Sequence, residues 1–195
     1  MKTDLIYEYL ERIANLLRTD TRKSGLIKGL QPVQLEALHY LSNCNRYSNT
    51  PAAVADYLGL TKGTVSQTLG VLENAGMIEK LPDFKDRRVG HLQLTELGKS
   101  LIGELIPPKT LQAALTLISE ADKNLILDAL RRILRAMQQA NQLRTFGVCK
   151  TCRHHRLEED DLHRCGLTGE VLQDVDIEKI CREHEAPTLP GCVNS

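Results

Sequence analysis

Residues 58–69 read Leu-Gly-Leu-Thr-Lys-Gly-Thr-Val-Ser-Gln-Thr-Leu, a pattern typical of two short helices joined by a tight turn. The first helix begins after Thr50, the expected N-cap, and ends at Gly59. The second begins after Thr61 and ends at Gly76, and its apolar residues recur at the spacing of a buried helical face. These apolar residues are Val65, Leu69 and Leu72. The pattern predicts a helix-turn-helix, whose second helix lies in the major groove of DNA.

The outward face of the second helix carries small or hydrogen-bonding side chains and a single cation. Glutamine can pair bidentately with adenine, and threonine and serine can bond to bases or to phosphates. A polar face is also typical of an ordinary solvated helix, so this face by itself leaves both interpretations open. The candidate DNA-contacting residues on it are Thr61, Lys62, Thr64, Ser66 and Gln67.

A hairpin with a charged tip is predicted directly after this helix. Two strand-like runs, residues 77–81 and 89–94, flank residues 82–88, which read Pro-Asp-Phe-Lys-Asp-Arg-Arg. The pair Arg87 and Arg88 is suited to phosphate contacts or to insertion into a narrow minor groove, where the negative potential is strong. We expect Asp83 or Asp86 to orient these guanidinium groups by bidentate pairing.

Four segments within residues 51–98 closely resemble the MarR family of transcriptional regulators in order and spacing. They are residues 58–69, residues 72–80 (Leu-Glu-Asn-Ala-Gly-Met-Ile-Glu-Lys), residues 86–88 (Asp-Arg-Arg) and residues 92–98 (Leu-Gln-Leu-Thr-Glu-Leu-Gly). The resemblance extends more loosely over residues 1–143. It implies a mostly α-helical fold with a small β-wing, a winged helix-turn-helix with long dimerisation helices. It also implies a homodimer that binds a pseudo-palindrome of double-stranded DNA as a sequence-specific regulator, in the role of a repressor.

The resemblance also implies roles for single residues. By it, the recognition-helix residues are Thr61, Lys62, Thr64, Ser66 and Gln67, the wing arginines are Arg87 and Arg88, and the wing-positioning carboxylates are Asp83 and Asp86.

Apolar spacing predicts long helices on either side of this winged helix. One amphipathic stripe covers residues 3–18, and a long helical region covers residues 111–137, after the break at Pro107. The expected N-caps of the later helices are Thr95 and Ser119. The family likeness implies that the first and last helices interlock two protomers, although packing within one chain would give the same periodicity.

We divide the chain into residues 1–145, the DNA-binding and dimerisation domain, and residues 146–195, a cysteine-rich module.

The cysteines of this module depart from the family pattern and read C-x2-C-x12-C-x15-C. They are Cys149, Cys152, Cys165 and Cys181. A Cys-x2-Cys pair lets two thiolates reach one ion from a tight turn, a geometry that structural zinc and iron–sulfur clusters share. We favour zinc, with His184 as a further candidate ligand three residues after Cys181. An iron–sulfur cluster is the alternative, because one close pair followed by two lone cysteines is similar in spacing to high-potential [4Fe–4S] proteins.

Each metal has a different consequence for the regulator. A closed tetrahedral zinc would be structural, whereas a cluster would make the protein a redox or iron sensor. A small-molecule effector is the other candidate for modulation. Free thiols in a flexible tail are the remaining interpretation, but some fifty residues with few large apolar side chains can hardly fold without a metal. Outside the module's four, Cys44 is interpreted as a packing residue, and Cys192 lies in a terminal Pro-Gly-Cys segment.

Composition excludes several classes of protein. The chain has 195 residues, 42% of them hydrophobic, but no apolar run near the roughly 18 residues of a membrane span and no secretory segment, so we expect a cytoplasmic protein. Its net charge of zero divides unevenly: residues 1–145 hold 19 Lys and Arg against 15 Asp and Glu, and residues 146–195 hold 6 Lys and Arg against 10 Asp and Glu.

No nucleophile and base pair, Walker loop or H-E-x-x-H helix indicates an enzyme. The alternative function is a metal-dependent enzyme or iron–sulfur electron carrier that uses the winged helix for protein contacts.

Overall fold

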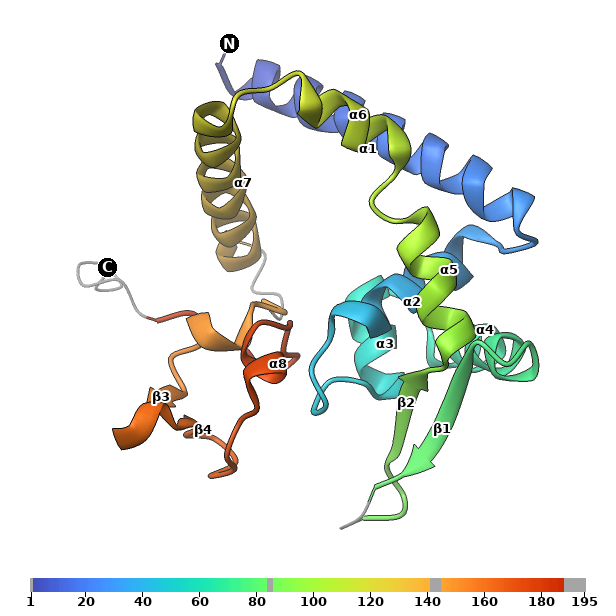
Figure 1. Ribbon diagram of the computed structural model, residues 1–195, viewed down its shortest axis with the longest axis vertical. Helices are drawn as coiled ribbons and strands as arrows, with labels where there is room; N and C mark the ends of the chain where they lie inside the picture. The colour runs from blue at the N-terminus through green and yellow to red at the C-terminus, as the bar shows by residue number, and fades with distance from the viewer. Residues whose placement is uncertain (1, 84–85, 141–144, 188–195) are drawn as a thin grey trace.

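A computed structural model of the chain describes residues 2–83, 86–140 and 145–187 (Figure 1). Up to residue 140 its elements are α1 (Lys2–Ile27), α2 (Pro32–Asn43), α3 (Pro51–Leu58), α4 (Lys62–Asn74), β1 (Ile78–Pro82), β2 (Gly90–Leu94), α5 (Glu96–Leu105), α6 (Lys109–Thr116) and α7 (Glu120–Ala140). From residue 145 they are the 3-10 turn η1 (Cys149–Thr151), β3 (His155–Leu157), the 3-10 turn η2 (Glu159–Asp161), β4 (His163–Cys165) and α8 (Asp174–Ile177). The predicted fold class, mostly helical with a small β-wing, is confirmed. Two residues of the predicted wing tip, Phe84 and Lys85, and Cys192 lie outside the described residues.

The hydrophobic core lies where α2, α3, α4 and α5 meet the wing strand β2. The α4 residues predicted to be buried are buried in it: Val65, Leu69 and Leu72. Around them the large buried side chains are Leu35, Leu38, Tyr40, Val54, Ile78 and Leu92. Burying a large apolar side chain stabilises the fold by about 1.5–3 kcal/mol. The helix α4 is therefore held by its inner face, and its outer face is left to solvent.

Capping side chains and two glycines fix the turns around this core. The Thr50 hydroxyl accepts a hydrogen bond from the Ala53 amide at 3.3 Å, and it caps α3 as the sequence predicts. Gly59, with φ of 65°, adopts the left-handed conformation that ends α3 and starts the turn into α4. A Cβ on Gly98 would lie 2.2 Å from the Met77 carbonyl oxygen, so this glycine allows α5 to approach the start of the wing closely.

The first helix is longer than the sequence predicts. We expected a helix over residues 3–18 followed by a loop, but α1 continues to Ile27. The reason is a packing contact at Gly25, whose added Cβ would lie 3.2 Å from Leu35 Cδ2. Glycine at this position lets α1 lie directly against α2, and that tertiary contact outweighs the poor helix propensity of glycine.

The helices α6 and α7 extend away from the core (Figure 1). The predicted cap is confirmed, because the Ser119 hydroxyl accepts a hydrogen bond from the Asp122 amide at 3.2 Å. None of the 21 residues of α7 is buried. Its large exposed apolar residues include Leu125, Ile126, Leu127, Leu130, Leu134 and Met137. On α1 the corresponding exposed residues include Leu5, Ile6, Tyr9, Ile13 and Leu16.

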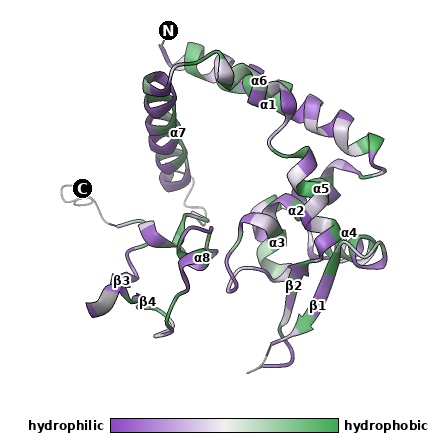
Figure 2. Cartoon of the chain, in the orientation of Figure 1, coloured by the Kyte–Doolittle hydropathy of each residue, from purple (hydrophilic) through white to green (hydrophobic). Residues whose placement is uncertain are grey.

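The cysteine-rich module docks against the loop between α2 and α3. The Ile180 amide donates to the Asn43 carbonyl and the Ile180 carbonyl accepts from the Asn45 amide, both at 2.9 Å. The module has its own small apolar cluster around Cys149, Leu172 and Ile177, while Figure 2 shows mainly hydrophilic residues along β3 and β4. So small a cluster is a weak basis for independent stability, and the docking contacts join the module to the winged helix.

Candidate nucleic-acid interface and cysteine pocket

The outer face of α4 carries every residue that the sequence assigns to the recognition helix. These residues are exposed: Thr61, Lys62, Thr64, Ser66 and Gln67. Thr61 is the N-cap; its Oγ1 accepts from the Thr64 amide at 3.2 Å and lies 2.9 Å from the Thr64 hydroxyl. The two threonines thus fix the start of α4, and Lys62, Ser66 and Gln67 extend from the same face. Their contact with DNA stays a prediction.

A hollow of about 320 Å³ lies between the start of α3, α4 and β1. It is lined by Pro51, Ala52, Lys62, Val65, Ser66, Leu69 and Lys80. Lys62 brings positive charge to a surface next to the predicted recognition face, whereas Lys80 on the same surface is ion-paired with Glu73. Sequence reasoning missed Lys80, because a lysine on a short strand gives no sign of which surface it joins.

The wing is a two-stranded antiparallel hairpin in which Ile78 pairs with Leu94 and Pro82 with Gly90. At its tip the Arg88 guanidinium donates to both Asp86 carboxylate oxygens, with contacts of 2.9 and 2.8 Å. These hydrogen bonds hold the pKa of Asp86 below its ordinary value. Asp86 therefore orients Arg88, as one of the two sequence-based alternatives predicts.

The second carboxylate of the wing, Asp83, has a different place. Its Oδ1 accepts from the Asp86 amide at 2.7 Å, and its Oδ2 lies 3.0 Å from His91 Nε2. The other ring nitrogen of His91 lies 2.5 Å from Asn49 Oδ1. His91 and Asn49 were not singled out from the sequence, where 42 residues separate them. Together they tie the wing tip to the loop between α2 and α3.

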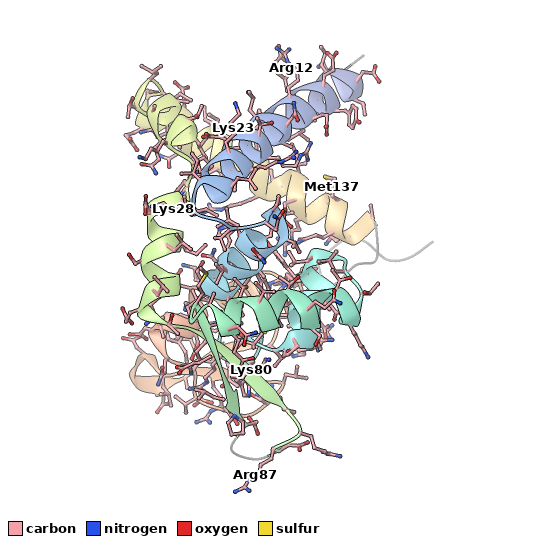
Figure 3. All side chains as sticks on the ribbon, turned by 90° about the vertical axis from the view of Figure 1, so that its right-hand side faces the viewer. Arg12, Lys23, Lys28, Lys80, Arg87 and Met137 are labelled. Carbon is pink, nitrogen blue, oxygen red and sulfur yellow. The ribbon has the colours of Figure 1, made fainter. Side chains whose placement is uncertain are left out.

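Arg87 lies at the far end of the wing (Figure 3). It is exposed, and Figure 3 shows it at the end of the hairpin, pointing away from the body of the protein. Among the described residues it makes no ion pair, whereas Arg88 is engaged with Asp86. The full charge of Arg87 is thus available to a phosphate, and a role in DNA binding stays a prediction.

The structure brings all four cysteines of the predicted metal site to one small pocket. Cys149, Cys152, Cys165 and Cys181 line a cavity of about 40 Å³, together with Asn45, Tyr47, His154, His155, Leu167, Thr168, Leu172 and Glu183. All four are free thiols. Across the described ranges, however, no three His, Cys, Asp or Glu side chains are placed as ligands of one common metal ion. The thiols surround a shared space without converging on a point.

Part of the pocket is buried, and this affects its thiols. Burial first, and then the neighbouring Cys181, Cys165 and Cys152, raise the pKa of Cys149 to about 12. Burial also raises the pKa of Cys181. Because the charged form is disfavoured, Cys149 and Cys181 are neutral thiols at neutral pH when no cation is bound. A bound metal would displace their protons.

One wall of the pocket carries an unsatisfied donor. Asn45 is 1% exposed, and its Oδ1 accepts from the Tyr47 amide at 3.2 Å. This bond fixes the orientation of the amide, and the buried Nδ2 has no acceptor oxygen or nitrogen among the described residues; the nearby Cys181 sulfur is only a weak acceptor. An unpaired buried donor destabilises a fold by about 1–3 kcal/mol. A group in the pocket that accepts a hydrogen bond would remove this penalty.

His184, the further candidate ligand, does not line the pocket. Its Nδ1 lies 2.6 Å from the Thr145 hydroxyl and its Nε2 lies 3.0 Å from the Thr151 hydroxyl. Both ring nitrogens are therefore engaged, and His184 is placed as a buried structural residue. Cys44 is likewise buried in the main core and outside the pocket, in agreement with its interpretation as a packing residue.

Known proteins resemble the chain over its winged-helix part. A sequence model described as "MarR family" matches residues 28–89. The "Transcriptional repressor MprA" of Escherichia coli K12 is 28% identical over 117 residues, which cover 59% of this chain and 66% of that protein. The protein of the same name from E. coli O157:H7 has the same values. The chain thus spans about two thirds of the length of these curated relatives.

Solved structures agree with the fold. The "S. aureus MepR-DNA complex" has a TM-score of 0.53 and 25% sequence identity, and the match covers 67% of this chain and 97% of that one. A MarR transcriptional regulator from Methanosarcina mazei Go1 has a TM-score of 0.58 at 19% identity, covering 70% of this chain and 99% of that one; it supports the fold alone. Among the described helices, none has the length and apolarity needed to cross a membrane.

Proposed function

We propose that the chain is a winged-helix regulator of the MarR family, which it resembles, and that it binds specific DNA sequences and acts as a transcriptional repressor. The observation that carries this proposal is the exposed polar face of α4, which lies beside a wing whose tip carries Arg87 and Arg88. Polar side chains on a helix can read base edges in the major groove, while arginines on a hairpin bind phosphates or the minor groove. Two similar proteins, one named a repressor and one solved with DNA, support it. Members of this family are regulators and not enzymes.

The functional unit that we propose is a homodimer formed through α1, α6 and α7. An isolated helix gains most of its stability from packing, yet α7 has no buried residue within one chain and exposes Leu130 and Leu134. The exposed apolar residues of α1 offer a matching surface. A second copy of the chain would bury both sets and would place two recognition helices on a palindromic site.

We further propose that two inputs modulate the regulator. A metal centre bound by Cys149, Cys152, Cys165 and Cys181 is supported by the pocket that these thiols share. A small-molecule effector is supported by a hollow of about 610 Å³ between α1 and α2, which Arg18 and Arg22 line. For the metal, zinc and an iron–sulfur cluster both accept thiolate ligands.

Fluorescence anisotropy on DNA from the promoter of the chain's own gene tests the proposed function. The full-length protein should bind this DNA with a specificity that survives excess competitor DNA. Because phosphate contacts release counterions, the affinity should fall by about 10³-fold or more between roughly 50 and 200 mM salt. A scrambled duplex of the same composition is the control. Equal affinity for both duplexes would contradict sequence-specific regulation.

A further inference from the structure

The four-cysteine pocket and the wing are connected through one loop, residues 45–49, which we call the connecting loop. We propose that the pocket holds a cysteine-ligated iron–sulfur cluster, that Asn45 donates a hydrogen bond to it, and that the connecting loop relays its occupancy to the wing. This inference deepens the proposed function, since it names the metal centre and the route by which it acts on DNA binding.

The spacing of the thiols favours a cluster over a single ion. In a closed zinc site each sulfur lies about 2.3 Å from the metal, so four sulfurs pack about 3.8 Å apart and leave no space between them. Here Cys149, Cys152, Cys165 and Cys181 line a cavity of about 40 Å³, and no three ligand groups in the described ranges meet at one point. In a cluster the thiolates bind different irons around an inorganic core. The ligands of a cluster surround a volume, as these four cysteines do.

Asn45 gives a second, independent indication of the occupant. Its Nδ2 is buried, has no acceptor oxygen or nitrogen among the described residues, and belongs to a side chain that lines the pocket beside the Cys181 sulfur. Sulfide and thiolate sulfurs of a cluster accept N–H hydrogen bonds, which stabilise the negative charge of the core. No lysine or arginine lines the cavity, so its donors to such a charge are neutral groups. Among them are the Asn45 amide and the Glu185 backbone amide, which donates to Cys152 Sγ at 3.4 Å.

The pocket reaches the connecting loop directly. Arg182, next to the ligand Cys181, donates its amide to the Ser48 hydroxyl at 2.8 Å. Its guanidinium donates to Asp56 of α3 at 2.8 and 2.6 Å. Asn45 contributes both to the pocket wall and to the loop. A bound cluster would fix Cys181 and therefore the backbone of Arg182, which in turn holds the connecting loop and α3.

The same loop holds the wing at its other end. The Asn49 carbonyl accepts from the Leu92 amide at 2.7 Å, and the Asn49 side chain bonds to His91. His91 in turn contacts Asp83 at the wing tip at 3.0 Å. When the cluster is lost, Cys181 is no longer held to the other three cysteines, and the loop that Arg182 contacts becomes less restrained. We therefore expect the cluster-loaded protein to bind DNA more tightly than the cluster-free protein, by about 5- to 150-fold, the usual range of such coupling.

The experiment compares full-length protein purified without oxygen with the same protein after the centre is removed and after it is rebuilt with ferric iron, ferrous iron and sulfide. Iron, sulfide and zinc are counted per chain, and the visible spectrum is recorded. We expect a brown protein with two or four irons, matching sulfide and no zinc. The Cys152→Ser/Cys165→Ser variant should lose both iron and colour, while Cys44→Ala, which changes a buried cysteine outside the pocket, should keep them. A colourless protein with one zinc per chain would overturn the cluster and leave the proposed metal centre intact.

Variants of the asparagines test the donor and the relay. Asn45→Ala keeps all four thiols, and its cluster should be lost several-fold faster to a chelator. Asn49→Ala should bind the cluster normally, yet its DNA affinity should differ less between the loaded and cluster-free states, because the variant loses the contact with His91 and keeps only the backbone bond to Leu92. Asn43→Ala removes an exposed side chain that bonds only to the end of α2, and it is the matched control for both.

Hydrogen exchange provides a readout that does not depend on DNA. The Leu92 amide should exchange faster after cluster removal, because its acceptor is the Asn49 carbonyl. Unchanged exchange and unchanged DNA affinity on cluster removal would overturn the relay. Absence of DNA binding in every state would instead contradict the proposed function itself, so the two failures are distinguishable.

Discussion

Replacing Arg87 by alanine tests whether the wing binds DNA or is only exposed to solvent. Arg87 lies at the end of the hairpin, and its charge is not neutralised by an ion pair with any described residue. A homodimer brings two such arginines to the DNA. If each neutralises one phosphate, the variant should reduce the slope of log affinity against log salt by about 1.8. At about 0.15 M salt this corresponds to a loss of roughly 30-fold in affinity, or about 2 kcal/mol.

The structure also predicts an order of effects within the wing. Arg88 donates two hydrogen bonds to Asp86, so the net charge of that pair is zero and its removal should change the salt slope less than the removal of Arg87. Arg12, which Figure 3 places at the opposite end of the protein from Arg87, is the matched control: Arg12→Ala should leave the slope unchanged. The assay is anisotropy of a labelled operator at five salt concentrations, with circular dichroism to confirm folding.

Two results would refute this reasoning. If Arg87→Ala folded normally and bound with the wild-type salt slope, the tip would not contact phosphate. If Arg88→Ala reduced the slope as much as Arg87→Ala, the pair with Asp86 would break on binding, and the ordering inferred from the free protein would be wrong.

Further predictions concern the recognition helix, the dimer and acid stability. Gln67→Ala should weaken discrimination at one base pair of each half-site by about 1–3 kcal/mol while changing binding to unrelated DNA little, and a uniform loss over all sequences would make Gln67 a backbone contact. Leu130→Glu/Leu134→Glu should yield monomers by light scattering, because a dimer would bury both charges, whereas Leu157→Glu, at an exposed leucine of β3, should stay dimeric; a dimeric double variant would exclude α7 from the interface. Burial lowers the pKa of His39, so below about pH 6.5 the unfolded chain binds more protons and the free energy of unfolding falls as the pH falls. His39→Gln should flatten this decline in urea titrations, and an unchanged decline would assign it to other groups.

The sequence was sufficient for the winged helix because its local signals agree with one another. Thr50, Thr61 and Thr95 each cap a helix that the apolar spacing also predicts, and Gly59 marks the turn between two of them. Local capping, helical periodicity and the core all favour the same structure, so little depends on distant contacts. The end of α1 could not be predicted in this way, because its continuation past residue 18 depends on how closely Gly25 packs against Leu35.

In the candidate sites, too, features fixed by local sequence could be predicted and features fixed by distant contacts could not. The exposed positions on α4 follow from subtracting its buried face, and the pairing of Asp86 with Arg88 follows from their proximity in sequence. His91 and Asn49 could not be found in the sequence, since their contact joins a strand to a loop 42 residues away. The cysteine spacing indicated a common site but not its size. His184 has suitable spacing for a ligand, yet both of its ring nitrogens contact threonine hydroxyls.

Metal binding to the cysteine-rich module can influence DNA binding only if the module contacts a part of the protein that also positions the DNA-binding elements. The connecting loop meets this condition: Asn45 and Ser48 contact the module, and Asn49 contacts the wing. The loop is also short and directly precedes α3, which begins at the Thr50 cap. A shift of the loop therefore changes the wing and the first helix of the helix-turn-helix together, while α4 stays fixed by Val65, Leu69 and Leu72 in the core. Occupancy of the pocket should thus act on overall affinity through the wing more than on base preference through α4.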